Sequence, residues 1–255
     1  DLRLAPDALH LWRALVAWFG GYATLISVFA VFAPRNLGGF EVRIESRAGT
    51  VGRLVGAPDW SGQQRRESAT ARLDRAARAV TAPYLFLSAA LCVAFASGGA
   101  PGLKAVTQAL GVISTSGVSI DARGFEGGVA VEAVAAVFIA LAATRHVFSG
   151  GGGAARLGRF RGDPEVELAA IAVGLAAAWI FLRHFFAGFE IETPATLAAG
   201  AAALWGALFT CFSFLSTTGY VSEHWDGARS WSGLSRPGLI LLGLAAMGGG
   251  VASTA

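Results

Sequence analysis

Charged residues are scarce in this sequence, and lysine is almost absent. Asp, Glu, Lys and Arg together make up 15% of the 255 residues, whereas soluble domains average about 25%. Lys104 is the only lysine. Hydrophobic residues make up 54% of the chain, and the mean hydropathy is +0.56. These proportions exclude an ordinary soluble domain and predict a membrane protein.

Cysteine is also scarce, since only Cys92 and Cys211 are present and both lie inside apolar runs. A disulfide framework and a cysteine metal site are therefore not expected. His146 and His184 lie at the ends of apolar runs, and no cluster of histidines and carboxylates forms around them. The sequence accordingly predicts no resident metal and no cofactor.

The net charge of +3 is carried almost wholly by arginine. A basic balance can indicate nucleic-acid binding, but these arginines lie between apolar runs, so membrane topology explains them better. Residues 34–78 hold nine arginines against five acidic residues, and a second basic, glycine-rich loop covers 145–161. The positive-inside rule places both loops in the cytoplasm, and we expect no nucleic-acid partner.

Apolar runs of about the length of a membrane span recur along the chain. They cover residues 11–33, 79–97, 129–148, 166–187 and 234–252. Residues 101–113 are apolar too, but they are too short to cross about 30 Å of hydrocarbon as a helix. Their length indicates a re-entrant helix that begins at Pro101, and a second such helix is predicted with Thr193 as N-cap and Pro194 at its first position.

Each predicted re-entrant helix leads into a polar strip. The strips are "VISTSGVS" (112–119) and "FLSTTGYVS" (214–222), which share the order Ser-Thr-x-Gly. Extended backbone at membrane depth is tolerated only where it is buried in protein or lines a watery cavity. Uncharged carbonyl and hydroxyl oxygens suit an alkali cation that has lost its water, and the negative end of the preceding helix favours a cation. Ordinary small-residue helix packing is the alternative explanation.

A span, a re-entrant helix, a strip and a second span form a unit that occurs twice. The predicted fold class is an all-α membrane protein built from repeated helix–pore-helix–filter–helix units, as in potassium channels. The predicted segments are the closing span of an earlier copy (1–33), a cytoplasmic Arg-rich segment (34–78), one complete unit (79–148), a cytoplasmic loop (149–165) and a second unit (166–255).

Five segments, in order, resemble the superfamily of bacterial potassium transporters typified by TrkH and KtrB, which is related to the plant HKT proteins. They are "LWRALVAWFGGYATL" (11–25), "VISTSGVSIDARGF" (112–125), "DPEVELAA" (163–170), "FLSTTGYVS" (214–222) and "MGGGVASTA" (247–255). The resemblance covers nearly the whole chain. It implies four joined membrane-pore-membrane units around one ion path.

The resemblance also implies which residues bind the ion. The selectivity filter of one unit would be Ser114, Thr115, Ser116, Gly117 and Val118, and that of the next would be Ser216, Thr217, Thr218, Gly219 and Tyr220. A gate loop inside the membrane would consist of Gly248, Gly249, Gly250, Val251, Ala252, Ser253 and Thr254.

Three positions depart from the usual residues of the superfamily. Val118 stands where Phe is usual, and Ala252 and Ala23 each stand where Gly is usual. We therefore expect smaller packing behind the first strip and a less mobile gate loop. Only two of the four expected filter segments are found, so we expect the chain to be part of a protein of roughly twice its length that does not conduct without the remainder.

As a member of this superfamily, the protein would take up potassium across the cell membrane without covalent chemistry. Potassium would be the substrate rather than a cofactor. The resemblance further implies a multi-pass protein in the lipid bilayer, a homodimer, and a cytosolic nucleotide-binding regulatory ring of the TrkA or KtrA type. By the same resemblance, Gly117 and Gly219 favour potassium over sodium. A sodium-permeable transporter similar to HKT is the nearest alternative.

Two other classes of protein are kept as alternatives. A membrane-embedded serine hydrolase would use Ser116 or Ser216 as nucleophile and would need a histidine within hydrogen-bond reach. The four histidines lie at the ends of apolar runs or in loops: His10, His146, His184 and His224. A helical scaffold that does not conduct ions is the other alternative.

Some polar and aromatic residues near the ends of the runs have simpler interpretations. Trp12, Arg13 and Trp18 are typical of interfacial anchors. Glu132 is expected at a solvated helix start, and Lys104 is expected to face water.

Overall fold

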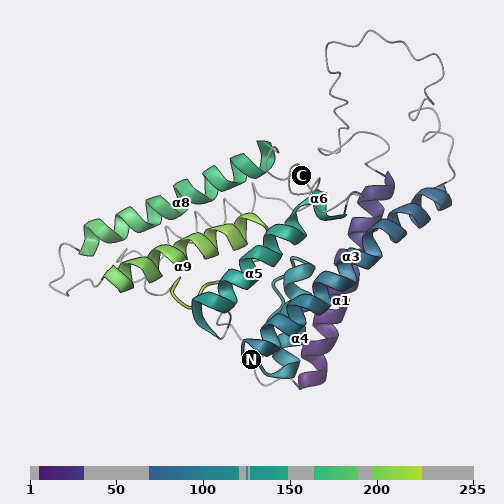
Figure 1. Ribbon diagram of the computed structural model, residues 1–255, viewed down its shortest axis with the longest axis horizontal. Coiled ribbons are helices and arrows are strands. Elements are labelled where there is room, and N and C mark those ends of the chain that lie inside the picture. The colour runs from purple at the N-terminus through teal and green to yellow at the C-terminus, as the bar shows by residue number, and fades with distance from the viewer. Residues whose placement is uncertain are drawn as a thin grey trace, which may run out of the picture.

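The computed structural model describes residues 6–31, 69–120, 125, 127–148, 164–188 and 197–225. All regular elements in these ranges are helices (Figure 1). They are α1 (Asp7–Val31), α3 (Ala69–Ser97), α4 (Gly102–Ile113), α5 (Gly128–Ala143), α6 (Arg145–Phe148), α8 (Pro164–Gly188) and α9 (Leu197–Leu215). The prediction of an all-α protein is confirmed for this part of the chain.

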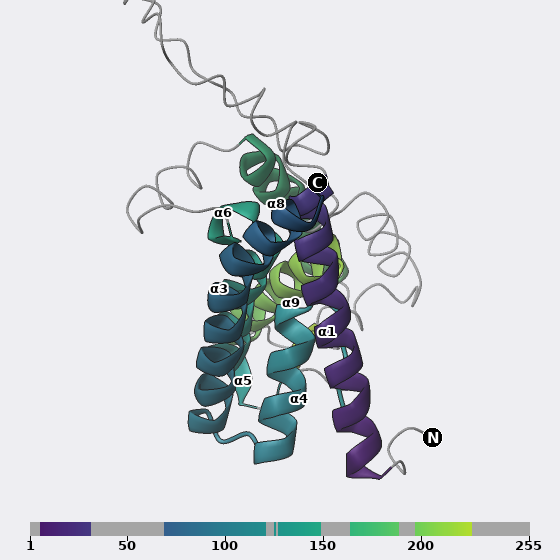
Figure 2. The same cartoon turned by 90° about the vertical axis from the view of Figure 1, so that its right-hand side faces the viewer.

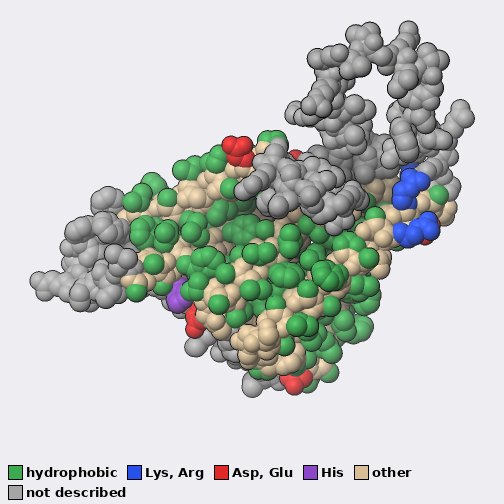
Figure 3. All heavy atoms as spheres, in the orientation of Figure 1, with side chains coloured by type: hydrophobic (Ala, Val, Ile, Leu, Met, Phe, Trp, Pro, Cys, Tyr) green, Lys and Arg blue, Asp and Glu red, His purple; other side chains and the backbone are tan. Residues whose placement is uncertain are grey.

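Four of these helices, α1, α3, α8 and α9, are long and apolar enough to cross a membrane. Several of their large apolar side chains face outward: Trp12 is 64% exposed, Phe86 71% and Leu175 68%. Figure 3 shows hydrophobic side chains over most of the visible face, with charged side chains at its margins. Because an apolar surface this extensive is solvated by lipid rather than by water, the chain is a membrane-embedded protein.

The outward face of α8 is the clearest lipid-facing stripe. Its exposed large apolar residues are spaced three or four positions apart, which places them on one side of a helix. They are Leu168, Ile171, Leu175, Trp179 and Leu182. The neighbour of α8 is α9, which lies along it (Figure 1).

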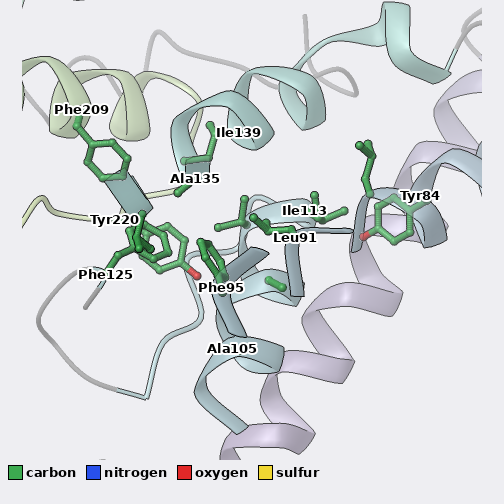
Figure 4. Packing of buried hydrophobic residues seen from close by; sticks show 14 of the residues in the cluster. Tyr84, Leu91, Phe95, Ala105, Ile113, Phe125, Ala135, Ile139, Phe209 and Tyr220 are labelled. Carbon is green, nitrogen blue, oxygen red and sulfur yellow. The ribbon is translucent and has the colours of Figure 1, made fainter. Parts of the chain in front are cut away.

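The main core lies where α1, α3 and α4 pack against one another and α5 packs against α3 and α4. Its largest fully buried side chains include Tyr84, Leu91 and Phe95 from α3 and Ile139 from α5. Figure 4 shows these residues gathered around α4. The core therefore surrounds the short helix that leads into the first polar strip.

Trp18 belongs to this packing and is not the interfacial anchor that the sequence suggested. Its Nε1 donates a hydrogen bond to Ser88 Oγ at 2.9 Å, and its carbonyl oxygen accepts one from the Tyr84 hydroxyl at 2.9 Å. Its ring stacks on that of Tyr22 at 6.2 Å between centroids. A half-buried indole with a satisfied N–H adds packing energy between α1 and α3.

α3 begins at Ala69, ten residues before the predicted start of its apolar run at 79. The added turns are rich in Ala and Arg, which are strong helix formers. Arg78 and Asp74 form an exposed ion pair one turn apart, which supports the helix in water. The apolar part of α3 still ends at Ser97, as predicted.

α4 has the length predicted for a re-entrant helix. Its 12 residues rise about 18 Å, whereas the 25 residues of α1 rise about 38 Å. Figure 2 shows α4 starting beside the lower ends of α1 and α3 and stopping part of the way along them. Pro101 is the N-cap and not the first helical residue, because its ψ of 146° is extended; the helix begins at Gly102.

Two other elements differ from the predictions in length. The run 129–148 is not one span: α5 ends at Ala143 because Thr144 is extended (φ −99°, ψ 132°), and α6 follows. α9 has 19 residues and is long enough to cross a membrane, so it is longer than a helix expected to run only partway in. The predicted caps Thr193 and Pro194 lie outside the described residues.

Candidate functional site

The two polar strips begin with the same helix-ending motif. After α4, the N–H of Thr115 bonds to the carbonyl oxygen of Val112 at 3.0 Å, and the N–H of Ser116 bonds to that of Gly111 at 2.9 Å. After α9, the equivalent bonds join Thr217 to Phe214 at 3.0 Å and Thr218 to Ser213 at 2.9 Å. This pair of bonds is the Schellman motif, which satisfies the last carbonyls of a helix.

Both strips place a threonine in the left-handed conformation that this motif requires. Thr115 has φ 50° and Thr217 has φ 59°, and no other non-glycine residue in the described ranges has a positive φ. Glycine usually occupies this position, and a β-branched residue there is strained by about 1–3 kcal/mol. Such strain is concentrated at functional sites, so its occurrence at equivalent positions of both strips marks them as a candidate site.

The side chains of the strips also pair in the same way. Ser114 Oγ lies 2.9 Å from Ser116 Oγ, and Ser216 Oγ lies 3.0 Å from Thr218 Oγ1. Two residues after each threonine comes a glycine with positive φ, Gly117 at 62° and Gly219 at 80°. Every equivalent pair is 102 positions apart in the sequence, so the same local structure occurs twice at a fixed spacing.

The strips present backbone oxygens that the fold leaves unused. The carbonyl oxygens of several strip residues accept no hydrogen bond from the described part of the chain; they include those of Thr115, Ser116, Gly117, Thr217, Thr218 and Gly219. No strip residue is charged. Uncharged carbonyl and hydroxyl oxygens at the C-terminal ends of two helices form an environment that favours a cation without fixing it tightly.

The two strips lie against each other. The Tyr220 hydroxyl donates a hydrogen bond to the Val118 carbonyl oxygen at 2.9 Å. A Cβ on Gly117 would stand 2.1 Å from the Thr218 carbonyl oxygen, and a Cβ on Gly111 would stand 2.5 Å from the Tyr220 hydroxyl. Glycine is therefore required at both positions, because any side chain would push the strips apart.

An aromatic cluster supports the Tyr220 ring. Phe125, which follows the first strip, lies 4.7 Å from Tyr220 and 5.9 Å from Phe209 of α9 between ring centroids. Phe95 of α3 lies 5.2 Å from Phe125. Figure 4 shows these rings together, with residues from both repeats contributing.

The second strip is held by side chains that the first strip lacks. Ser213 Oγ accepts the N–H of Tyr220 at 2.7 Å, and Thr210 Oγ1 accepts the N–H of Ser222 at 3.2 Å. The equivalent residues of the first repeat are Gly111 and Gln108. Gln108 is buried, and its Nε2 has no partner among the described residues.

Glu132 was expected at a solvated helix start, and the structure shows this to be wrong. Its side chain is fully buried near the start of α5. One carboxylate oxygen accepts the Trp205 indole N–H and the Ser222 hydroxyl, each at 2.7 Å, and the other accepts the N–H of Glu223 at 2.6 Å. The signal in the sequence was a carboxylate within an apolar run, which in membrane proteins usually has a functional partner.

The expectation for Lys104 was also wrong. Lys104 lies near the start of α4 and is only 6% exposed, so it does not face water. Short Gly, Ala and Val neighbours in α4 allow the helix to sit deep between α1 and α3, which buries its polar residues as well. Arg13 is half-buried on α1, while Trp12 is exposed as an anchor would be.

The structure brings together the ten predicted strip residues and leaves three of them exposed: Ser116, Thr217 and Gly219. Neither the Ser116 nor the Ser216 hydroxyl bonds to a histidine in the described ranges. The same ranges hold no group of three or more His, Cys, Asp or Glu residues placed to hold a metal ion. The predicted gate loop, 248–254, and the Arg-rich segment before residue 69 lie outside the described residues.

Comparison with protein-family models and with curated proteins finds no match to this chain. The geometry of the strips is therefore the main indication of function.

Proposed function

We propose that the two strips line part of a path for potassium ions through the membrane. The observation that carries the proposal is the repeated geometry: two helix ends, two strained threonines and two positive-φ glycines, placed against each other with unpaired carbonyl oxygens. A dehydrated alkali cation needs several weakly polar oxygens in place of its water. A divalent ion would call for carboxylates, and the strips have none.

The proposed path has two parts. Ions lose water at the strips, where carbonyl dipoles and the negative ends of α4 and α9 stabilise them. They then pass the Gly-rich segment 248–254, which acts as a gate. The resemblance to the TrkH and KtrB superfamily supports potassium as the ion, the cell membrane as the location, a homodimer as the assembly and a cytosolic nucleotide-binding ring as the regulator.

The proposal is tested by the ion dependence of thermal stability. Ligands that bind only the folded protein raise its melting temperature by mass action. We expect the purified full-length protein to melt at a higher temperature in potassium or rubidium than in lithium at equal ionic strength. A helical scaffold would melt at the same temperature in all of these salts, and that result would contradict the proposal.

A further inference from the structure

We propose that Glu132 is a positioning residue that holds the second strip in place for ion discrimination, an inference that rests on the function proposed above. Its carboxylate joins three parts of the fold: α5, which carries it; α9, through Trp205; and the segment after the strip, through Ser222 and Glu223. Ser222 and Glu223 lie two and three residues beyond Tyr220, the last residue of the strip.

The arrangement fits a carboxyl group with two acceptor oxygens and no close substitute. Three donors converge on two oxygens: an indole N–H and a backbone N–H, which can only donate, and a hydroxyl. A carboxylate offers acceptors on both oxygens. A glutamine in its place would point its amide NH₂ at one of the two fixed N–H donors, whichever way it is turned. An aspartate side chain is one methylene shorter, so its carboxylate would not reach the donors of both α9 and the segment after the strip.

The burial of this carboxyl group indicates a task beyond packing. A buried carboxylate in a membrane protein is expensive and is retained where its partners need it. Here two of the three partners, Ser222 and Glu223, directly follow the strip. In the described residues, the Glu223 N–H and the Ser222 hydroxyl both donate to the Glu132 carboxylate.

Comparison of the two repeats shows why the second strip needs this anchor. At the positions equivalent to Trp205 and Ser222, the first repeat has Leu103 and Ile120, neither of which can donate a side-chain hydrogen bond. The first strip is instead tied to the second, because its Val118 carbonyl oxygen accepts the Tyr220 hydroxyl. Glu132 therefore stabilises the second strip directly and the first strip through Tyr220.

The experiment compares Glu132→Gln with Glu167→Gln, a matched change at an exposed glutamate of α8. Amide hydrogen exchange of residues 216–225 is measured by mass spectrometry on the purified full-length protein in lipid nanodiscs. Loss of a hydrogen bond to a charged acceptor should open this segment about tenfold more often. We expect faster exchange at 220–223 in Glu132→Gln and wild-type exchange in Glu167→Gln.

The second measurement is ion selectivity. Rubidium uptake is measured with potassium or sodium as competitor, and the inhibition by potassium is divided by the inhibition by sodium. This ratio does not depend on how much protein folds, so a merely structural role would not change it. We expect it to fall in Glu132→Gln and to be kept in Glu167→Gln. Ser222→Ala and Trp205→Phe each remove a single donor, so they should give intermediate ratios if the glutamine variant does not fold.

Unchanged exchange at 220–223 in Glu132→Gln would contradict the proposed role of Glu132. Faster exchange with an unchanged ion ratio would contradict it as well. Failure of the proposed function is separate, because it would appear in the wild-type protein as rubidium uptake with no preference between potassium and sodium.

Discussion

Thr115 and Thr217 show how single residues shape this site. Each adopts a left-handed backbone that its β-branched side chain disfavours, at the position where a helix commonly ends in glycine. The strain persists because the Schellman bonds before it and the packed strip after it fix the backbone on both sides. The sequence order Ser-Thr-x-Gly therefore encodes a turn, followed by oxygens that the turn leaves free.

Replacing Thr217 with glycine should relieve this strain. Glycine reaches φ 59° freely, and the relief of about 1–3 kcal/mol exceeds the roughly 0.5–1 kcal/mol that glycine loses through a more flexible unfolded chain. We expect Thr217→Gly to raise the free energy of unfolding by about 1 kcal/mol, measured by thermal unfolding in detergent.

Thr217→Val is the matched control, because it keeps the β-branch and removes only an exposed hydroxyl. It should be no more stable than the wild type. A glycine variant less stable than both would show that the backbone at Thr217 is not strained.

At the scale of elements, α4 meets the second strip through a contact that depends on Gly111. The missing side chain at Gly111 makes room for the Tyr220 hydroxyl and the Val118 carbonyl oxygen. The same position in α9 is Ser213, whose hydroxyl holds the backbone of its own strip. The two strips thus share a backbone motif but differ at this position. Gly111 leaves space for residues of both strips, whereas Ser213 forms a hydrogen bond to the backbone of the strip that follows it.

Gly111→Ala should separate the strips and destabilise the protein by about 1–3 kcal/mol, since its Cβ would stand 2.5 Å from the Tyr220 hydroxyl. Gly174→Ala, a control inside α8 with open space around it, should be stabilising by about 1 kcal/mol. Both are measured by thermal unfolding.

Adding Tyr220→Phe should recover part of the loss in Gly111→Ala, because it removes one of the two oxygens that the new Cβ would meet. The two changes should therefore be less destabilising together than their sum. Strict additivity would show that Gly111 and Tyr220 do not share this contact.

At the scale of the whole molecule, the sequence predicted the helical membrane class and the short α4 correctly. Hydropathy and length carry that information, since both follow from the bilayer thickness. It predicted Glu132, Lys104 and Trp18 wrongly, because position near the end of an apolar run does not show whether a neighbouring helix covers the residue. The contact between the strips joins Val118 to Tyr220 across 102 residues, and no local pattern predicts it.

The repeated strips also relate the two halves of the described fold. α3 and α4 precede the first strip, α8 and α9 precede the second, and α5 lies beside both α4 and α9. Ion conduction by such an arrangement requires that the strips supply oxygens to one shared path. The geometry that joins them, through Gly117, Gly111 and Tyr220, is consistent with that requirement.

Ion competition in the Gly219→Ser variant tests the central claim most directly. A Cβ on Gly219 meets no protein atom within 4 Å, while the φ of +80° disfavours any side chain there, so the change disturbs the strip backbone without disturbing the packing around it. Rubidium uptake by the full-length protein is measured with potassium or sodium as competitor. We predict that potassium competes better than sodium in the wild type and that this preference falls in Gly219→Ser. The same preference in both proteins would contradict the assignment of the strips to the ion path.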